Sequence, residues 1–387
     1  MRTEPCILTG GQAVAEAMRQ IDPDVVPVYP ITPQTPIIQG FASFVAQGRA
    51  HGELVDVESE HSAMSAAIGS ALAGARTITA TSSQGLALMA EVVYIAASMR
   101  APIVMAVGNR ALSGPINIHC DHSDSMLVRD SGVVQLFAEN AQEAYDLMFI
   151  ATRLAEHPDV LLPVLVCQDG FTITHSAEIV RLIDDAAAKT FVGDYHIPNA
   201  LLDLAHPTTQ GPFAMPDYYF ELRHQQLGAM QAALDAFDHI AWEYAVLSGR
   251  RYHAVELYGV GGAEHVIVSL GSTGGTVKDV VDAARADGEA VGLVQIRSFR
   301  PFPRADVRAT LGTRARVSVL DRADSPGGAA PLFADVAAAV QGMPVELRSF
   351  VYGLGGRDLH PEDVRALFES EERTHAYLGL RGEPCPV

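Results

Sequence analysis

Two short segments carry side chains whose types and spacing suit acid/base chemistry. The first is the proline-rich run 29–36, which follows a short apolar segment and contains the hydroxyl of Thr32. The second contains Glu58 and Glu60 and follows another apolar segment, roughly one strand–helix–strand unit later. A carboxylic acid held at a half-buried strand end keeps or shares its proton, which suits general acid/base work. A hydroxyl and an acid at two strand ends therefore predict a ligand site.

The elements that must position these side chains alternate through the first part of the chain. Apolar runs predict β-strands at 25–29, 54–57, 77–81, 102–107 and 161–167. Helical spacing predicts helices at 13–20, 35–46, 61–73, 86–99 and 143–155. This alternation predicts a doubly wound parallel sheet, in which ligands bind beyond the carboxyl ends of the strands.

Residues 190–250 break this pattern and indicate a connection between two domains. The turn-rich run 206–212 and the aromatic run 218–220 precede a predicted helix at 224–247. A second α/β unit follows, with strands at 266–270, 291–296 and 316–321 and helices at 277–286 and 331–340. We therefore predict an α/β protein with two doubly wound parallel-sheet domains. The expected boundaries are 1–195 for the first domain, 196–255 for a connecting arm and helix, and 256–387 for the second domain.

Composition narrows the class of protein. The 387 residues are 48% hydrophobic and 19% charged, which suits folded domains with large cores. A net charge of −19 argues against nucleic-acid binding and leaves a solvated acidic surface or a docking face for a basic partner. With neither a signal-peptide pattern nor a long apolar run, we expect a cytoplasmic protein without a membrane span.

The cysteines are few and scattered. The chain has Cys6, Cys120, Cys167 and Cys385, none at CxxC spacing, so we expect no zinc or iron–sulfur ligation within it. A reducing compartment is the simplest explanation. The segment 117–124 contains His, Cys and Asp, but its spacing suits no standard zinc site, and a hydrogen-bonded loop is favoured.

Three other features each allow two interpretations. The run 271–276 opens a helix and could cradle an anion, but it lacks GxGxxG spacing, so a tight turn is favoured. Arg110 follows the apolar strand 102–107, where its guanidinium could clamp a ligand carboxylate or form a salt bridge that fixes a loop. Of Glu58 and Glu60, one is expected to be structural.

Several separate blocks resemble a single family across nearly the whole chain. They are YPITPQTP (29–36), VESEHSA (57–63), ARTITATSSQGLALM (75–89), PIVMAVGNRAL (102–112), INIHCDHSD (116–124), DGF (169–171), RSFRPFP (297–303), VLDR (319–322) and YGLGGRD (352–358). This pattern is similar to the alpha subunit of the 2-oxoacid:ferredoxin oxidoreductases, the thiamine-diphosphate enzymes of the pyruvate:ferredoxin oxidoreductase type. The resemblance implies a pyrimidine-binding first domain and a second domain like the transketolase C-terminal domain, which mainly packs and assembles.

The resemblance also implies roles for particular residues. Glu60 matches the glutamate that hydrogen-bonds N1′ of the thiamine aminopyrimidine and so promotes deprotonation of the thiazolium carbon. Thr32 and Arg110 match positions that hold the substrate carboxylate. Pro30 and Ile31 are expected to contact the cofactor beside Glu60. No metal site is expected in this chain.

Half of the cofactor site is missing from the sequence. The chain has no GDG run followed by an asparagine, the pattern that binds Mg²⁺ and the diphosphate, and Gly193-Asp194-Tyr195 is the nearest approach. The resemblance implies that a beta subunit supplies Mg²⁺-diphosphate binding and a [4Fe-4S] cluster. Gamma and ferredoxin-like delta subunits are expected to complete the enzyme, with the hetero-oligomer forming a dimer.

The predicted function is that of an alpha subunit in CoA-dependent oxidative decarboxylation of a 2-oxo acid to acyl-CoA and CO₂, with electrons passed to ferredoxin. Pyruvate is the default substrate, since Thr32 leaves a neutral carboxylate site that disfavours a dianion. The alternative within the family is a bulkier branched-chain 2-oxo acid or phenylglyoxylate, with NAD or another acceptor. The alternative of another class is a non-catalytic assembly subunit, against which Glu60, Thr32 and Arg110 count.

Overall fold

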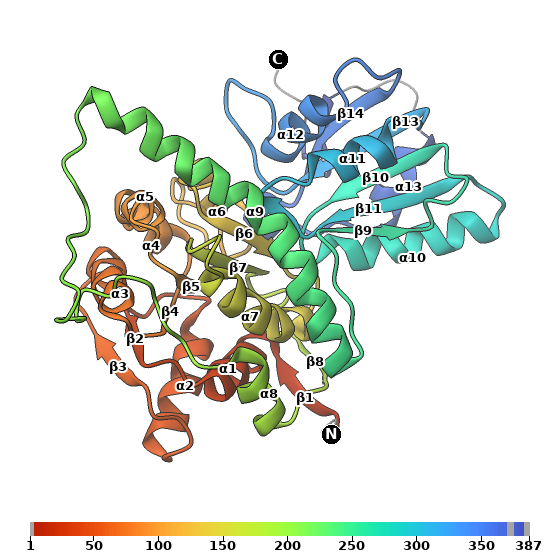
Figure 1. The fold of residues 1–387 in the computed structure, drawn as a ribbon. Helices are drawn as coiled ribbons and strands as arrows, with labels where there is room; N and C mark the ends of the chain where they lie inside the picture. Colours follow the sequence, from red (N-terminus) through yellow and green to blue (C-terminus); the bar gives the residue numbers. More distant parts are fainter. Residues whose placement is uncertain (1–3, 370–374, 383–387) are drawn as a thin grey trace.

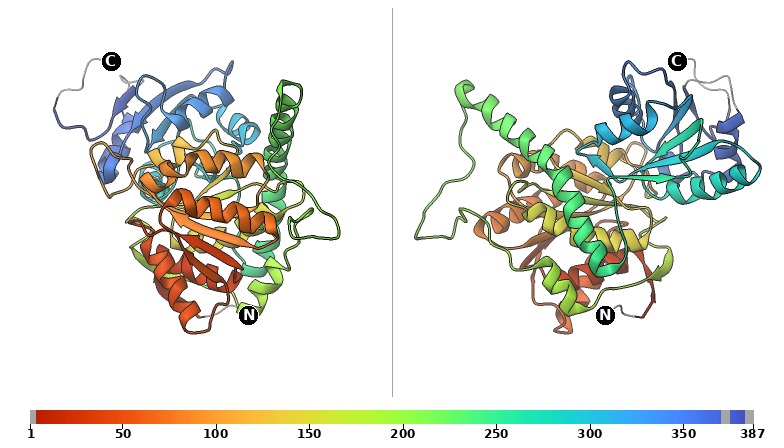
Figure 2. Two further views of the ribbon diagram at one scale, coloured as in Figure 1. Left: turned by 90° about the vertical axis from the view of Figure 1, so that its left-hand side faces the viewer. Right: turned by 45° about the vertical axis from the view of Figure 1, so that its right-hand side comes forward.

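Two open sheets joined by one long helix organise the computed structural model, which describes residues 4–369 and 375–382 (Figures 1 and 2). Cys385 lies outside the described residues. Both sheets are mainly parallel and are flanked by helices. The predicted α/β fold class with two parallel-sheet domains is confirmed. No helix in these described ranges is both long and apolar enough to cross a membrane.

The first sheet has seven strands in the order β12-β6-β7-β5-β4-β2-β3. Its strands are β2 (Val25–Val28), β3 (Glu53–Asp56), β4 (Thr77–Thr81), β5 (Ile103–Asn109), β6 (Val134–Phe137), β7 (Val164–Asp169) and β12 (Ser298–Arg300). All neighbours are parallel except β12, which runs antiparallel to β6. The chain passes from β2 outward to the edge strand β3 and then returns to β4 on the other side of β2. The winding therefore reverses between β2 and β4, and this reversal is where open α/β sheets bind ligands.

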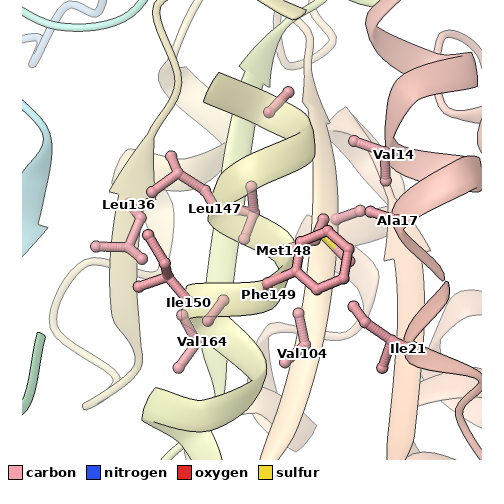
Figure 3. Close-up of a cluster of buried hydrophobic side chains, with 14 of the residues drawn as sticks. Val14, Ala17, Ile21, Val104, Leu136, Leu147, Met148, Phe149, Ile150 and Val164 are labelled. Atoms are coloured by element: carbon pink, nitrogen blue, oxygen red, sulfur yellow. The ribbon is translucent and has the colours of Figure 1, made fainter. Parts of the chain in front are cut away.

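Helices bury both faces of this sheet. On one face lie α1 (Gly10–Ile21), α2 (Thr35–Ala46) and α7 (Ala141–Glu156). Figure 3 shows Phe149 of α7 beside Val104 of β5, with Val14 of α1 in the same cluster. The opposite face carries α3 (Glu60–Ala73), α4 (Ser83–Leu88) and α5 (Ala90–Ser98), which pack against Ile103 and Met105. A strand covered on both faces must be apolar throughout, which explains the uninterrupted apolar run of β5.

Several elements differ from the sequence-based expectation. The helix predicted at 86–99 is two helices, because α4 ends and α5 begins around Met89. Contacts at the sheet edge orient α4 separately, since its first residue, Ser83, donates its N–H to Asp124. Helix α1 begins at Gly10, ahead of the predicted start, where Thr9 and Gln12 form a capping box. Sequence periodicity also missed short elements: β1 (Cys6–Thr9), its antiparallel partner β8 (Ala177–Val180), α6 (Ser123–Leu127) and α8 (Asp185–Val192).

The long helix α9 (Pro216–Ser248) crosses the first domain and leads to the second (Figure 1). It begins at Pro216 rather than near residue 224, because proline is compatible with the first helical turn. Its first turns project beyond the first domain (Figure 2). Its later part packs against α7, where buried Asp146 accepts hydrogen bonds from Tyr244 at 2.5 Å and from Arg250 at 2.6 and 2.7 Å.

The second sheet has six strands in the order β15-β14-β13-β10-β11-β9. They are β9 (Val255–Tyr258), β10 (His265–Ser269), β11 (Val291–Ile296), β13 (Arg316–Asp321), β14 (Glu346–Val351) and β15 (His375–Tyr377), with β9 antiparallel to β11. The flanking helices are α10 (Thr273–Ala286), α11 (Arg304–Leu311), α12 (Pro331–Ala339) and α13 (Pro361–Glu369), and η1 (Leu354–Gly356) is a single 3₁₀ turn. Although β12 follows β11 in the chain, it pairs with β6 of the first sheet. The predicted second domain thus supplies the edge strand of the first.

Candidate active site

Three loops meet at the carboxyl edge of the first sheet, where its winding reverses. They follow β2, β4 and β5, and the start of α3 joins them. The predicted residues Thr32, Glu60 and Arg110 all lie on this edge. The guanidinium of Arg110 donates from Nη1 to the backbone carbonyl of Thr32 at 2.9 Å, so these two predicted residues are in contact.

Glu60 is the first residue of α3, and only 7% of it is exposed. The N-cap Ser59 fixes this helix start by accepting the N–H of Ser62 at 3.3 Å. A methyl carbon at Gly85 would lie 2.7 Å from Oε1 of Glu60, so only glycine lets α4 approach the carboxylate this closely. Glu58, in contrast, is exposed and accepts a hydrogen bond from the Ser62 hydroxyl, which lowers the pKa of Glu58. Glu60 is therefore enclosed, whereas Glu58 stays at the surface of the helix start.

Several buried polar atoms at this sheet edge have no hydrogen-bond partner among the described residues. The buried side-chain oxygens of Thr81 and Ser82 have no hydrogen-bond partner among the described residues, and neither does Oε1 of Gln34. Through its Nε2, Gln34 donates to the carbonyls of Tyr29 at 3.0 Å and Ala80 at 3.3 Å, which ties the loop after β2 to β4. Buried polar groups are normally hydrogen-bonded, so unpartnered ones at a ligand-binding edge indicate a polar ligand. Sequence reasoning missed Gln34, Thr81 and Ser82.

Only 6% of Arg110 is exposed, and hydrogen bonds hold both its backbone and its side chain in place. Its Nε donates to the carbonyl of Asn117 at 2.9 Å. Both acceptors of its guanidinium are neutral carbonyls, and no described carboxylate forms an ion pair with it. Burial lowers the pKa of Arg110, as expected for a charge taken out of water. The salt bridge considered for this residue is not present among the described residues.

The loop after β2 presents its backbone to Arg110. Thr32 is exposed, and its hydroxyl makes no hydrogen bond to the described residues. Pro30 is exposed and Ile31 is half-buried, while the Thr32–Pro33 peptide is cis. The contact between Thr32 and Arg110 therefore uses the carbonyl oxygen of Thr32, and its hydroxyl, which drew attention in the sequence, has no hydrogen-bond partner in the described part of the chain.

Asp124 connects the residues that follow β4 to the end of β5 through hydrogen bonds. No role was predicted for it from the sequence. Its carboxylate accepts the N–H groups of Ser83 at 2.9 Å and Arg110 at 3.0 Å, and the side-chain amide of Asn109 at 2.9 Å. Burial raises the pKa of Asp124 to about 6, and these hydrogen bonds oppose that rise. The sequence signal that could have pointed to Asp124 was the block 116–124, for which a hydrogen-bonded loop was predicted.

Asp169 fastens the two domains together at the end of β7. It accepts hydrogen bonds from Nε2 of His122 at 2.8 Å, from Nη1 of Arg322 at 2.8 Å, and from the backbone and hydroxyl of Ser272 at 3.1 and 2.6 Å. Burial alone disfavours its charge, but His122 and Arg322 hold the pKa of Asp169 well below its usual range. Gly271 has a φ of 63°, and because it has no side chain, the Asp169 carboxylate can approach the start of α10 closely. The anion at the 271–276 turn is thus a residue of the chain itself.

The same contacts bring together three potential metal ligands. The ligand atoms of Cys120, His122 and Asp169 lie within 4.8 Å of one another, and all three residues are buried. However, Arg322 already donates to Asp169, and burial raises the pKa of the Cys120 thiol. A cation would have to displace a guanidinium and ionise that thiol. We therefore interpret this cluster as an interdomain hydrogen-bonded contact.

Comparisons with known proteins identify the family of this chain. Residues 16–241 match the family described as "Pyruvate flavodoxin/ferredoxin oxidoreductase, thiamine diP-bdg", and residues 263–364 match "Pyruvate:ferredoxin oxidoreductase core domain II". The chain is 54% identical to the pyruvate synthase subunit PorA of Thermotoga maritima, with 98% of both chains covered.

Two solved structures share the fold. The 2-oxoglutarate:ferredoxin oxidoreductase from Magnetococcus marinus has a TM-score of 0.75 at 22% identity, covering 95% of this chain and 65% of that chain. A split-gene transketolase, described as an inactive beta4 tetramer, has a TM-score of 0.54 at 14% identity, covering 93% and 95%.

The matched family and the PorA relative define the class of this protein as a subunit of a thiamine-diphosphate-dependent oxidoreductase. The chain belongs to the pyruvate:ferredoxin oxidoreductase family, as an alpha subunit. The predictions of the family, of a 2-oxo acid oxidoreductase and of its thiamine cofactor are thereby confirmed.

Replacing Gly85 tests how closely α4 must approach Glu60. In Gly85→Ala, the new carbon would lie 2.5 Å from Oγ1 of Thr81 and 2.7 Å from Oε1 of Glu60, so one of them must move. Misplacement of a catalytic group by about 1 Å costs roughly 10²-fold in rate, and we expect a loss of that order in turnover by the assembled enzyme. Gly275→Ala is the matched control, because no atom lies within 4 Å of the carbon it adds. Full activity in Gly85→Ala would contradict the proposed packing.

Proposed function

We propose that this chain is the alpha subunit of an enzyme that converts pyruvate and CoA to acetyl-CoA, CO₂ and a proton, passing the electron pair to ferredoxin. The observation that carries the proposal is Arg110, a buried guanidinium without an ion-pair partner among the described residues. A buried charge is costly unless it is paired. A carboxylate on the substrate is the natural partner, and the pyruvate synthase relative supports pyruvate as that substrate.

The geometry of Arg110 suits one carboxylate. A guanidinium has five N–H donors, and two of them are committed to the carbonyls of Thr32 and Asn117. One N–H of Nη1 and both N–H groups of Nη2 remain, and the proposed carboxylate takes one N–H from each nitrogen on the edge that they share. Two parallel donors on that edge match the two oxygens of a carboxylate. This arrangement fixes the carboxylate end of a 2-oxo acid, while its carbonyl carbon is left free to react.

The residues around Glu60 fit the pyrimidine half of thiamine diphosphate. The carboxyl is enclosed at the start of α3, and the unpartnered oxygens of Thr81 and Ser82 offer hydrogen bonds to a polar ring. When bound, the cofactor supplies a nucleophilic carbon and an electron sink for decarboxylation. Glu60 would hold a proton at N1′ of the pyrimidine, and Pro30 and Ile31 would flank the ring. These roles are the ones expected from the sequence.

We further propose that partner subunits supply the rest of the site. The chain has no Mg²⁺-diphosphate motif, and Cys6, Cys120 and Cys167 lie on separate elements. A beta subunit would hold Mg²⁺, the diphosphate and a [4Fe-4S] cluster, and gamma and delta subunits would carry electrons to ferredoxin. The assembled hetero-oligomer would form a dimer in the cytoplasm. A bulkier 2-oxo acid with NAD as acceptor is the alternative that a substrate screen on the purified complex would reveal.

Removing the proton of Glu60 should stop catalysis. Glu60→Gln keeps the shape of the side chain but cannot exchange a proton with N1′, and loss of a positioned acid/base typically costs about 10² to 10⁴ in rate. We expect assembly to be retained, because the carboxylate faces the ligand edge. Decarboxylation by the reconstituted complex is the measurement, and Glu58→Gln is the control. Normal turnover by the Glu60 variant would show that the assignment is wrong.

Changes at Arg110 should act on substrate affinity. Arg110→Lys keeps the charge but loses the fork, so we expect a strong rise in KM for the 2-oxo acid. If the hydroxyl of Thr32 contacts the substrate, Thr32→Val should raise KM mildly, because one hydrogen bond contributes about 0.5–1.5 kcal/mol net. Steady-state kinetics of both variants check this. An unchanged KM in both would place the substrate elsewhere.

Because the sequence has no Mg²⁺-diphosphate motif, we expect the isolated chain to bind thiamine diphosphate poorly. Most of the affinity is expected to come from Mg²⁺ and the diphosphate, which the partner subunit would hold. Calorimetry of the lone chain with thiamine diphosphate and Mg²⁺ should give weak binding, and addition of the beta subunit should restore it. Tight stoichiometric binding by the lone chain would show that these residues form a complete site.

A further inference from the structure

The segment 116–124, here called the bridging loop, connects Arg110 to the second domain. The backbone carbonyl of Asn117 accepts Nε–H of Arg110 at 2.9 Å. The side-chain amide of Asn117 donates to the carbonyl of Gly355 at 2.9 Å, and its Oδ1 accepts the N–H of His119 at 2.6 Å. One residue thus touches both the guanidinium and a loop more than two hundred positions away in the chain.

The second domain receives the bridging loop on a glycine turn. Gly353, Gly355 and Gly356 have φ values of 64°, 61° and 81°, a region that other residues rarely adopt. A methyl carbon at Gly355 would lie 2.4 Å from Nδ2 of Asn117, and one at Gly356 would lie 2.3 Å from Cβ of His119. Bare backbone is therefore needed here, both for the conformation and for the close approach.

Further contacts hold the bridging loop against the second domain. The N–H of Gly355 donates to the carboxylate of Asp121 at 3.2 Å. The N–H of His122 donates to the carbonyl of Arg322 at 2.8 Å, beside the Asp169 cluster. The loop is thus pinned to the second domain at Asn117, Asp121 and His122. Its carbonyl at Asn117 cannot move without breaking these contacts.

We propose that Asn117 is a positioning residue through which the glycine turn of the second domain sets the orientation of the Arg110 guanidinium. With Nε held by Asn117 and Nη1 by Thr32, the guanidinium plane is fixed from two directions, and one edge faces the substrate. The second domain, expected only to pack and assemble, then contributes to substrate affinity. This inference rests on the proposed function, because it takes Arg110 as the carboxylate clamp.

Kinetics of the reconstituted complex test the inference. Asn117→Ala removes the bridge to Gly355, and Gly355→Ala places a carbon against Asn117 from the second domain. Each should raise KM for the 2-oxo acid by about 2- to 12-fold, the equivalent of one hydrogen bond, with a smaller change in kcat. Gly275→Ala is the matched control, because it lies in the second domain outside the bridging loop and no atom lies within 4 Å of the carbon it adds, so its kinetics should not change.

A double variant separates positioning from general loosening. In the Arg110→Lys background, Asn117→Ala should raise KM no further, since its effect passes through the guanidinium. Additive effects, or a fall in kcat without a rise in KM, would overturn the inference. If Arg110→Lys raises KM while Asn117→Ala and Gly355→Ala do not, the positioning role fails and the clamp stands. An unchanged KM in Arg110→Lys itself would reject the clamp. Gly355→Ala, which leaves Asn117 intact, decides the question alone if Asn117→Ala does not assemble.

Discussion

The buried carboxylate of Asp169 is the contact on which the rest of the site depends. It accepts hydrogen bonds from His122 of the first domain and from Arg322 and Ser272 of the second. Removing one partner from a buried ion pair typically costs about 3–5 kcal/mol, because the other charge is left uncompensated. His122 is itself part of the bridging loop, so this contact also helps to hold the loop in its position next to Arg110.

The site combines two kinds of unpaired polar group. Arg110 keeps its charge in a buried place with only carbonyl acceptors, and the oxygens of Thr81 and Ser82 have no described partner. Each costs stability in the free chain, and under the proposed function each would gain a partner when a ligand binds. Asp124 and Gly85 keep the surrounding loops close enough for this to happen. The proposed function assigns these donors and acceptors to a substrate and to half of a cofactor.

The sequence allowed the parallel core to be predicted, and it drew attention to Thr32, Glu60 and Arg110, which the structure places at one sheet edge, because both have local signals. Apolar runs revealed β2, β5 and β11, and the blocks around Glu60 and Arg110 carried the resemblance. The features that the sequence could not show depend on contacts between residues that lie far apart in the chain. The short strand β12 is defined by pairing with β6. The lack of a carboxylate partner for Arg110 among the described residues, and the bond from Asn117 to Gly355, appear only once the chain is folded.

The placement of β12 has a consequence for dividing the chain. Because Ser298–Arg300 closes one side of the first sheet, cutting the chain anywhere before it would leave β6 as a bare edge. Bare edges of sheets offer unpaired N–H and C=O groups to any passing strand and invite aggregation. The first domain, although it carries the acid and the guanidinium, is therefore a poor candidate for separate expression. In a gene fusion or fission, the functional boundary of this unit would fall beyond residue 300 rather than at the end of the long helix.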